Sequence, residues 1–510
     1  MHGNTLVLKL FDPGMSIFHR VGVAGLYLTL KALAPEEFSS LGSWQLEPKR
    51  VELTWRQSPR DLLEPIIQKA FTISSRGAVQ FLAHSQHPMG DLAMLSLHQA
   101  VLLTYLQHGG TRKLAGKEQS LTFDFDGKIV SSSMKPVQCY KHQNAAQLLF
   151  DQKGRFRREI KLDGSFLPGG GTRHILHAEA TALKNAAERF LPLLFTPVAS
   201  LYYLIFHRNR DGKYDKRRMV ALVLPHVTDL EVFQRNYQRF LQAPVQRLYV
   251  QNLGDAGLTA LTMLNVLSPE GFLPSLDIDS CTVVSMGTVG WSTQQKTRTG
   301  ILVIQNIDGQ RLRFYDLALS ILPNRVWVKE DGHWFCHPSL ARGLLAENIA
   351  SGQRWYANFS QLMHSQKLAN ILARERKELN TMMQHAQWPQ DADRLLVEAV
   401  HQALRNRYGA IYQRARERGE VAQFGREFER LRTSLMRTKN AATLRAELAD
   451  LFARGGLNPV LQENWHNLLP LFTGGDWQRA RDLALFALAS YVGKGAEELV
   501  EAESFEEEED

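Results

Sequence analysis

Patterns typical of β-strands run through the first 355 residues of this chain and then stop. Alternating segments such as WQLEPKRVELTW (44–55) and apolar runs such as RMVALVLP (218–225) lie among stretches with helical spacing. From about residue 357, apolar residues recur only at helical spacing. This change predicts an α+β fold, with a mixed domain over residues 1–355 followed by an all-α helical bundle over 356–495.

The individual elements follow from the same periodicities and from turn residues between them. Strands are expected at 5–11, 44–55, 120–132 (a hairpin turning at Asp126-Gly127), 218–225, 281–289, 299–306 and 324–336. Helices of the mixed domain are expected at 16–33, 175–191 and 228–242. Helices of the bundle are expected at 357–385, 390–419, 422–437, 441–454, 461–472 and 476–492.

One uncharged segment, FLPLLFTPVASLYYLIF (190–206), needs a separate interpretation. It has 17 residues and two prolines, whereas a spanning helix needs about 20 apolar residues, so it predicts a buried helix followed by a strand. We therefore expect no membrane association. The three cysteines are widely spaced and form no CxxC pair, and the N-terminus lacks the apolar segment of a secretory signal. These features favour a cytoplasmic protein without disulfides or a zinc site.

The distribution of charge indicates a polyanionic partner. The net charge is +8, but the last 14 residues contain nine acidic residues and no basic one, so the preceding 496 residues carry about +17. A basic body favours nucleic acid as the partner, although a basic surface can also serve solubility alone. The acidic tail, 496–510, is expected to be disordered because like charges repel one another.

The glycine-rich stretch FLPGGGTRHILHAEAT (166–181) is the first candidate for an active site. It lacks the lysine of a Walker loop, and the chain has no HExxH, GxSxG or catalytic cysteine motif. We therefore predict no catalytic residues, no metal and no cofactor. Two interpretations stay open: a backbone loop that holds phosphate with Arg173, or a turn in which Thr172 caps the following helix.

Four further loops and one bundle segment are rich in basic residues. The loops interleave Lys and Arg with glycine, glutamine or aromatic residues, a composition suited to phosphate contact and base stacking. These loops are QHGGTRKLAGK (107–117), KGRFRREIK (153–161), HRNRDGKYDKRR (207–218) and GWSTQQKTRTG (290–300). Between His401 and Arg445 the bundle has ten Arg and one Lys against four Glu. Some of these arginines are expected to pair with the glutamates, and the others to track a strand backbone.

Long segments at both ends resemble a known family. LKLFDPGMSIFHRVGVAGLYLTLKAL (8–33) resembles the start of the large subunit of type I CRISPR Cascade complexes, in the Cas-eight branch first described from the myxobacterial subtype. RTKNAATLRAELADLFARGGLNPVLQENWHNLLPLFTGGDWQRARDLALFALASY (437–491) is similar to the end of the same group. The central block around PGGGTRHILHAEAT is also similar, so the resemblance spans nearly the whole chain.

The resemblance implies a subunit without catalytic activity in a crRNA-guided complex. Its N-terminal domain would read the protospacer-adjacent motif in the target duplex and open it, while base pairing reads the rest. Its bundle, similar to a separate small subunit, would hold the displaced single strand. Its expected partners are crRNA, target double-stranded DNA and its displaced strand, the Cascade backbone and cap subunits, and a helicase-nuclease or a transposition adaptor.

The candidate DNA-binding residues lie in the glycine-rich and basic loops and in the helical bundle. They are Gly109, Gly110, Arg112, Lys113, Gly169, Gly170, Arg173, Arg208, Arg210, Lys216, Arg217, Gln294, Gln295, Lys296, Arg298, Arg405, Arg407, Arg414 and Arg418. Two other functions stay open. A metal-dependent nuclease would use Asp124, Asp126 and Glu179, and a basic scaffold protein would contact no nucleic acid directly.

Overall fold

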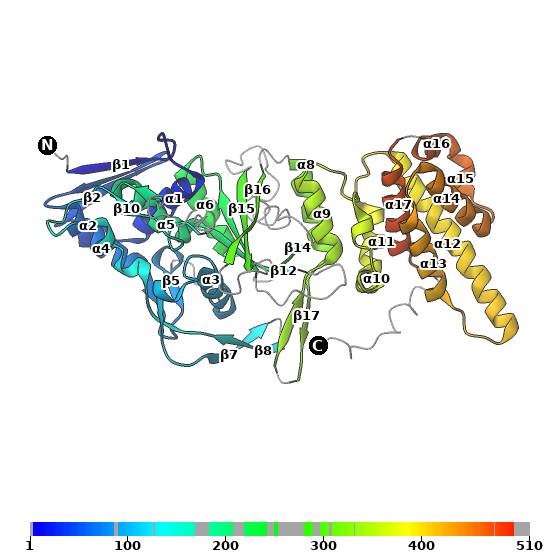
Figure 1. The fold of residues 1–510 in the computed structure, drawn as a ribbon, viewed down its shortest axis with the longest axis horizontal. Coiled ribbons are helices and arrows are strands. Elements are labelled where there is room, and N and C mark those ends of the chain that lie inside the picture. Colours follow the sequence, from blue (N-terminus) through cyan, green and yellow to red (C-terminus); the bar gives the residue numbers. More distant parts are fainter. Residues whose placement is uncertain are drawn as a thin grey trace.

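The computed structural model is an elongated molecule with its mixed part at one end and its helical part at the other (Figure 1). The structure describes residues 4–85, 90–125, 128–168, 183–207, 219–241, 249–252, 280–288, 296–304, 309–330, 332–473 and 475–493. In this part of the chain, strands occur only up to β18, and every later element is helical. The α+β fold predicted from the sequence is therefore confirmed.

A five-stranded sheet forms the centre of the mixed part. Its order is β14-β12-β13-β15-β16; β12 and β14 are parallel and the other pairs are antiparallel. Its strands are β12 (Leu201–His207), β13 (Met219–Pro225), β14 (Tyr249–Asn252), β15 (Cys281–Thr288) and β16 (Lys296–Ile304). β13 is buried along almost its whole length, which explains its continuous apolar run.

Two helices beside this sheet approach each other unusually closely. α1 (Ile17–Ala32) packs along α5 (Ala187–Ala199), the buried helix predicted to precede a strand. Glycine makes the contact possible: a Cβ on Gly22 would lie 1.9 Å from the carbonyl oxygen of Pro192, and one on Gly25 2.1 Å from that of Phe195. The Thr196 hydroxyl donates a hydrogen bond to the carbonyl of Phe18 across the same interface, at 3.0 Å.

Smaller sheets and helices complete the mixed part. A three-stranded antiparallel sheet has the order β1-β3-β2, and the remaining strands form two-stranded pairs. The strands are β1 (Thr5–Lys9), β2 (Gly42–Glu47), β3 (Arg50–Trp55), β4 (Phe71–Ile73), β5 (Val79–Phe81), β6 (Arg112–Leu114), β7 (Gln119–Phe125), β8 (Lys128–Met134), β9 (Val137–Tyr140), β10 (Ile160–Lys161), β11 (Lys184–Asn185), β17 (Arg325–Val328) and β18 (Trp334–His337). The other helices are α2 (Pro59–Ala70), α3 (Asp91–Leu103), α4 (Ala146–Leu149), α6 (Leu230–Leu241), α8 (Gly309–Ile321) and α9 (Leu340–Ala350).

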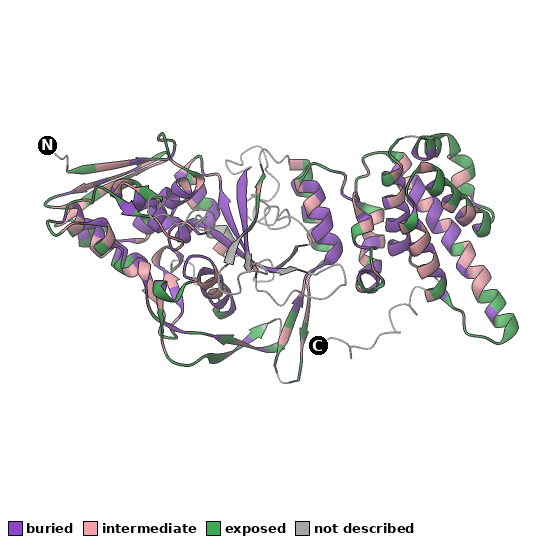
Figure 2. Ribbon diagram, in the orientation of Figure 1, coloured by how far each residue is buried: buried purple, intermediate pink, exposed green. Residues whose placement is uncertain are grey.

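The helical part follows α9. Its helices are α10 (Gln366–Ala373), α11 (Arg376–His385), α12 (Asp391–Arg418), α13 (Phe424–Arg437), α14 (Ala441–Gly455), α15 (Pro459–Glu463), α16 (Trp465–Thr473) and α17 (Trp477–Ser490). A buried stripe on α12 packs against α17, which is buried on all sides from Asp482 to Ser490, as in the centre of a bundle (Figure 2). No helix in the described part of the chain combines the length and apolarity needed to cross a membrane.

Three expected helices differ from the structure. The helix expected at 357–385 is replaced by a short 3₁₀ turn, α10 and α11. The Ser365 side chain caps α10 by accepting a hydrogen bond from the amide of Leu368, and Glu375, between α10 and α11, accepts one from the amide of Leu340 in α9. The helix expected at 461–472 is divided between α15 and α16. The helix expected at 175–191 is also wrong in part: Lys184–Asn185 pairs with β10 as a strand, and α5 begins at Ala187.

Buried histidines predict a loss of stability in acid. Burial lowers the pKa of His84, His142 and His401 to about 4, 3 and 4. The unfolded chain binds these protons near pH 6.5, so stability present above that pH is lost as the pH falls towards the folded pKa. Each histidine is expected to lower the free energy of unfolding by up to about 1.4 kcal/mol per pH unit across this window.

Unfolding measured between about pH 7 and pH 5 checks this expectation. In a His401→Gln variant, the amide can donate to the carbonyl of Ala487, which lies 3.0 Å from Nε2 of His401, but it does not titrate. The free energy of unfolding of this variant should therefore fall less steeply with decreasing pH, because one proton fewer is taken up on unfolding. A pH dependence equal to that of the native chain would contradict the assignment.

Candidate nucleic-acid interface

The C-terminal end of α12 extends beyond the neighbouring helices (Figure 1), and its last two turns, 412–418, are exposed except at Ala415 (Figure 2). The helix begins with Asp391 and Asp393 in its first turn and has Arg416 and Arg418 in its last, charges that complement the helix dipole. It ends at Gly419, whose φ of 68° closes the helix in the left-handed conformation. The local sequence therefore makes a long helix with a basic end.

One face of this helix carries a stripe of two arginines and a tyrosine. Arg405, Tyr412 and Arg416 are separated by seven and four residues, a spacing that places them on the same side of an α-helix. Arg405 and Arg416 are exposed, and Tyr412 is 38% exposed. Among the described residues, neither arginine forms an ion pair. We call Arg405, Tyr412 and Arg416 the α12 stripe.

Arg407 lies away from the α12 stripe and is used inside the bundle. Its guanidinium pairs with Glu427 of α13 at 2.9 Å, and the two side chains are 16% and 9% exposed. Arg430 pairs with the same carboxylate at 2.9 Å. Burial alone would raise the pKa of Glu427, but hydrogen bonds from Arg430 and Arg407 hold it below its ordinary value. Arg407 thus joins two helices, while the predicted Arg414 and Arg418 are exposed.

The predicted loop at residues 109–113 is described in full. Gly109 and Gly110 lie in an exposed 3₁₀ turn, and a Cβ on either glycine would meet no atom within 4 Å. Arg112 turns inwards: it donates to the carbonyl of Leu102 at 3.4 Å, and burial lowers its pKa. Lys113 is exposed in β6. The turn and Lys113 are therefore accessible, whereas the Arg112 guanidinium is partly buried.

The remaining candidates lie in β16 or outside the described residues. Lys296 and Arg298 belong to β16, opposite Thr288 and Met286. The candidates outside the described residues are Gly169, Gly170, Arg173, Arg208, Arg210, Lys216, Arg217, Gln294 and Gln295.

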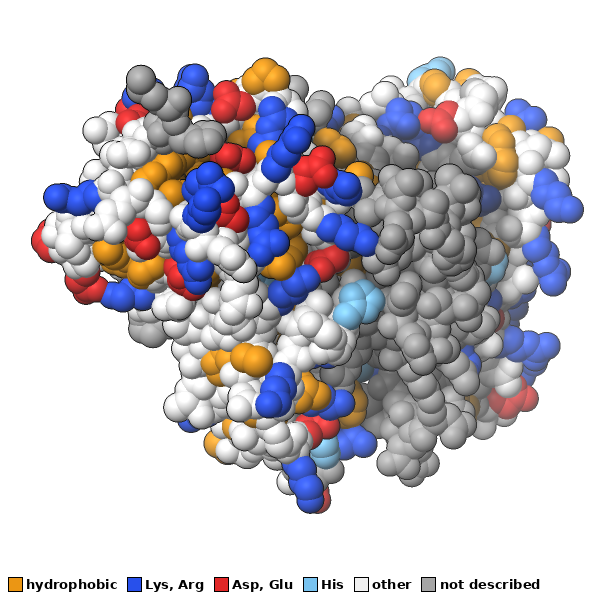
Figure 3. Space-filling model, turned by 60° about the vertical axis from the view of Figure 1, so that its left-hand side comes forward, with side chains coloured by type: hydrophobic (Ala, Val, Ile, Leu, Met, Phe, Trp, Pro, Cys, Tyr) orange, Lys and Arg blue, Asp and Glu red, His pale blue; other side chains and the backbone are white. Residues whose placement is uncertain are grey.

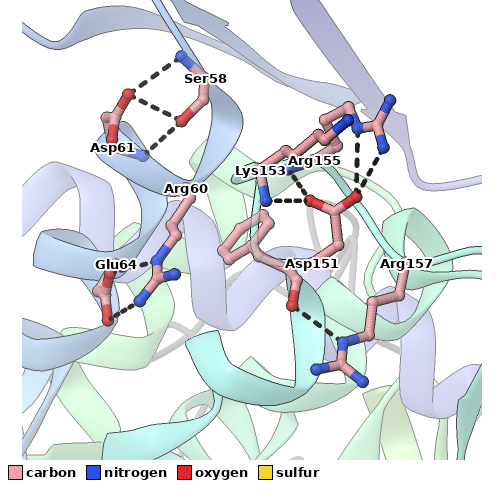
Figure 4. Close-up of polar contacts among 9 residues, drawn as sticks. Ser58, Arg60, Asp61, Glu64, Asp151, Lys153, Arg155 and Arg157 are labelled. Atoms are coloured by element: carbon pink, nitrogen blue, oxygen red, sulfur yellow. Dashed lines mark hydrogen bonds and ion pairs between the residues drawn. The ribbon is translucent and has the colours of Figure 1, made fainter.

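Two of the five basic side chains in the loop at 153–161 make internal contacts (Figure 4). Arg155 pairs with Asp151 at 3.0 Å, and Arg157 donates to the carbonyl of Phe150 at 2.9 Å. The aromatic ring of Phe156 packs against Trp55 rather than standing free. Arg155 and Arg157 therefore help to fix the conformation of the loop, while Lys153, Arg158 and Lys161 are exposed.

Positive charge on the mixed part is interspersed with acidic side chains on the face shown in Figure 3. Within the described ranges, no three His, Cys, Asp or Glu side chains gather in a group able to hold a metal ion. Asp124 lies in β7 of the predicted hairpin, paired opposite Ile129, while Asp126 and Glu179 fall outside the description. Within the described residues, the candidate site therefore consists of exposed basic side chains and contains no group of metal ligands.

Comparison with known proteins decides the family. Residues 7–194 match the DevT N-terminal domain and residues 384–510 match the DevT C-terminal domain, which together cover more than half of the chain. A relative from Myxococcus xanthus (strain DK1622), the CRISPR-associated protein Cas8a1/Csx13, is 28% identical over 530 residues, covering 96% of this chain and 89% of the relative. The chain belongs to the Cas8 family. The resemblance seen in the terminal segments is confirmed.

The two matched domains contain some of the candidate residues, while those at 208–217 and 294–298 lie between the matched regions. The N-terminal match runs from β1 into α5 and includes the exposed glycines Gly109 and Gly110. The C-terminal match includes all of α12 and therefore the α12 stripe. Tyr412 is a member of that stripe that sequence reasoning missed. Its spacing of seven residues from Arg405 was the available signal.

Proposed function

We propose that this chain is the non-catalytic large subunit of a crRNA-guided Cascade complex, and that its helical part holds the displaced strand of target DNA. The α12 stripe carries this proposal. The two exposed arginines lie on one helix face, about 16 Å apart along the axis, so they can contact separate phosphates of one strand. The tyrosine between them offers a ring on which an unpaired base can stack. Family membership supports the Cascade assignment.

The finer division of labour follows the same proposal. The mixed domain, residues 1–355, reads the protospacer-adjacent motif and helps to open the duplex. The exposed turn at Gly109 and Gly110, with Lys113 beside it, is its best described candidate, because a backbone without side chains can approach a groove closely. The helical domain, residues 356–495, acts like a small subunit. The assembled complex then recruits a helicase-nuclease or a transposition adaptor.

Removal of the α12 stripe tests the proposal. In the complex assembled with crRNA, Arg405→Ala/Tyr412→Ala/Arg416→Ala should weaken retention of the displaced strand by about tenfold or more, since one stacked base alone contributes about 1–3 kcal/mol. The salt dependence should also become shallower, by a slope of about 0.7 for each phosphate of a single strand that the variant no longer neutralises. Binding of labelled target DNA and of a single-stranded oligodeoxynucleotide across a salt series measures both effects.

A charge-matched variant controls for non-specific electrostatics. Arg437 and Arg445 are exposed on α13 and α14, so Arg437→Ala/Arg445→Ala removes two positive charges from the same bundle without touching the α12 stripe. Its effect on strand retention should be small. An equal loss of retention in the two variants would show that overall charge, not this helix face, binds the strand.

A further inference from the structure

The β17–β18 hairpin has two faces of sharply different chemistry. Its strands pair with Trp327 opposite Phe335 and Arg325 opposite His337, and the amide of Lys329 donates to the carbonyl of His333 at 2.7 Å. Side chains alternate between faces along a strand. One face therefore carries three cross-strand pairs, each made only of basic or aromatic residues: Arg325 with His337, Trp327 with Phe335, and Lys329 with His333.

The opposite face anchors the hairpin to the mixed domain. Val326, Val328 and Trp334 pack against a hydrophobic cluster that includes Phe123 and Val130 of the β7–β8 hairpin. The turn of the β17–β18 hairpin is held as well, because the amide of Ser131 donates to the carbonyl of Gly332 at 2.7 Å. Burial of one face fixes the direction in which the other face points.

The aromatic pair on the outer face is exposed to solvent. Trp327 is 46% exposed and Phe335 is 49% exposed. The ammonium group of Lys329 lies 5.6 Å from the centroid of the Phe335 ring, and the ring of His337 lies 6.5 Å away on the other side of the pair. The two strands contain no acidic residue; the sequence that joins them contains Glu330 and Asp331. Basic groups thus flank the exposed rings at both ends.

We infer that this face is a second nucleic-acid contact, on which an unpaired nucleotide stacks on the Trp327–Phe335 pair while the flanking basic groups meet its phosphates. Base stacking on aromatic side chains within a positively charged track is the usual chemistry of single-strand binding. A purely apolar protein surface would cover the flanking basic groups without offering them a negative charge, so charge complementarity favours nucleic acid. Part of the charge of Arg325 is offset, because its guanidinium pairs with Glu378 of α11 at 2.7 Å.

The inference rests on the proposed function in one respect only, since it requires that unpaired nucleic acid reaches this protein. The hairpin lies between the two family-matched regions and is separate from the α12 stripe. Its ligand can be an unpaired segment of the crRNA or a displaced DNA strand, because both offer bases and phosphates. RNA and DNA probes distinguish these sources.

Two double variants of the full-length chain separate stacking from apolar contact. Trp327→Leu/Phe335→Leu keeps apolar bulk but removes the ring faces, whereas Trp327→Phe/Phe335→Tyr keeps ring faces. The leucine variant should bind labelled oligothymidylate, oligouridylate or both at least about fivefold more weakly, and the ring-retaining variant should bind nearly as the native chain does. The probe whose affinity falls identifies the source. Thermal unfolding of each variant confirms that both fold, as expected for exposed sites.

Three results would overturn the inference. The leucine variant could bind both probes as tightly as the native chain, or the ring-retaining variant could bind as weakly as the leucine variant. The leucine variant could also leave probe binding intact while preventing assembly with the other Cascade subunits, which would assign the face to a protein partner. The α12-stripe variant measured in parallel keeps the two proposals distinct. Weaker binding in the leucine variant alone supports the hairpin and counts against α12.

Discussion

Gly22→Ala is expected to destabilise the chain by about 3 kcal/mol or more, at the upper end of the usual cost of overpacking a core. The new methyl group would lie 1.9 Å from the backbone oxygen of Pro192, which cannot rotate away as a side chain can. Gly25 faces Phe195 in the same way, so α1 and α5 would have to separate along their whole contact. The double variant Gly22→Ala/Gly25→Ala should fail to yield folded protein.

The midpoint of thermal unfolding of the purified chain measures this effect. Gly409→Ala is the matched control, because Gly409 also lies inside a helix but a Cβ there would meet nothing within 4 Å. Alanine has the higher helix propensity, so the control should be neutral or more stable by up to about 1 kcal/mol. If Gly22→Ala behaved like the control, α1 and α5 could not be as close as the structure places them.

Periodicity alone predicted those elements whose pattern matches their environment. Strand β13 is buried almost continuously, and its sequence is a continuous apolar run. Helix α12 is buried along a stripe, and its apolar residues recur at helical spacing. The break between α10 and α11 is different, because its cause is a distant contact. Glu375 leaves the helical pattern to accept hydrogen bonds from the amides of Leu340 and Ala341, at 2.8 and 3.1 Å. The sequence around Glu375 does not indicate this contact, because Leu340 and Ala341 are more than thirty residues away.

The candidate interface shows the same limit. Composition identified the arginines of α12, but it could not tell Arg405, which is exposed, from Arg407, which pairs with a buried glutamate of the next helix. In the β17–β18 hairpin, the sequence suggested strands without indicating which face would be covered. Only the packing of Val326 and Trp334 against the β7–β8 hairpin leaves the basic and aromatic face outside.

Asp393→Ala is expected to cost about 3–5 kcal/mol, because it leaves a largely buried guanidinium without its counter-charge. Asp393 is fully buried in the first turn of α12 and accepts a hydrogen bond from Nε of Arg479 in α17 at 2.8 Å. The hydroxyl of Tyr356 donates to its other oxygen. One carboxylate thus joins α12 and α17 to the segment that leads into the bundle, and thermal unfolding of the helical part reports its removal.

Two further variants show whether the effect comes from the unpaired charge. Asp391→Ala removes an exposed carboxylate two residues earlier, paired with Arg394 at 2.8 Å, and should cost less than about 1 kcal/mol. Asp393→Leu/Arg479→Met removes both buried charges, so it should recover much of the stability that Asp393→Ala forfeits. If the double variant were as unstable as the single one, the instability would come from the missing Tyr356 hydrogen bond or from packing, because no unpaired guanidinium would be left.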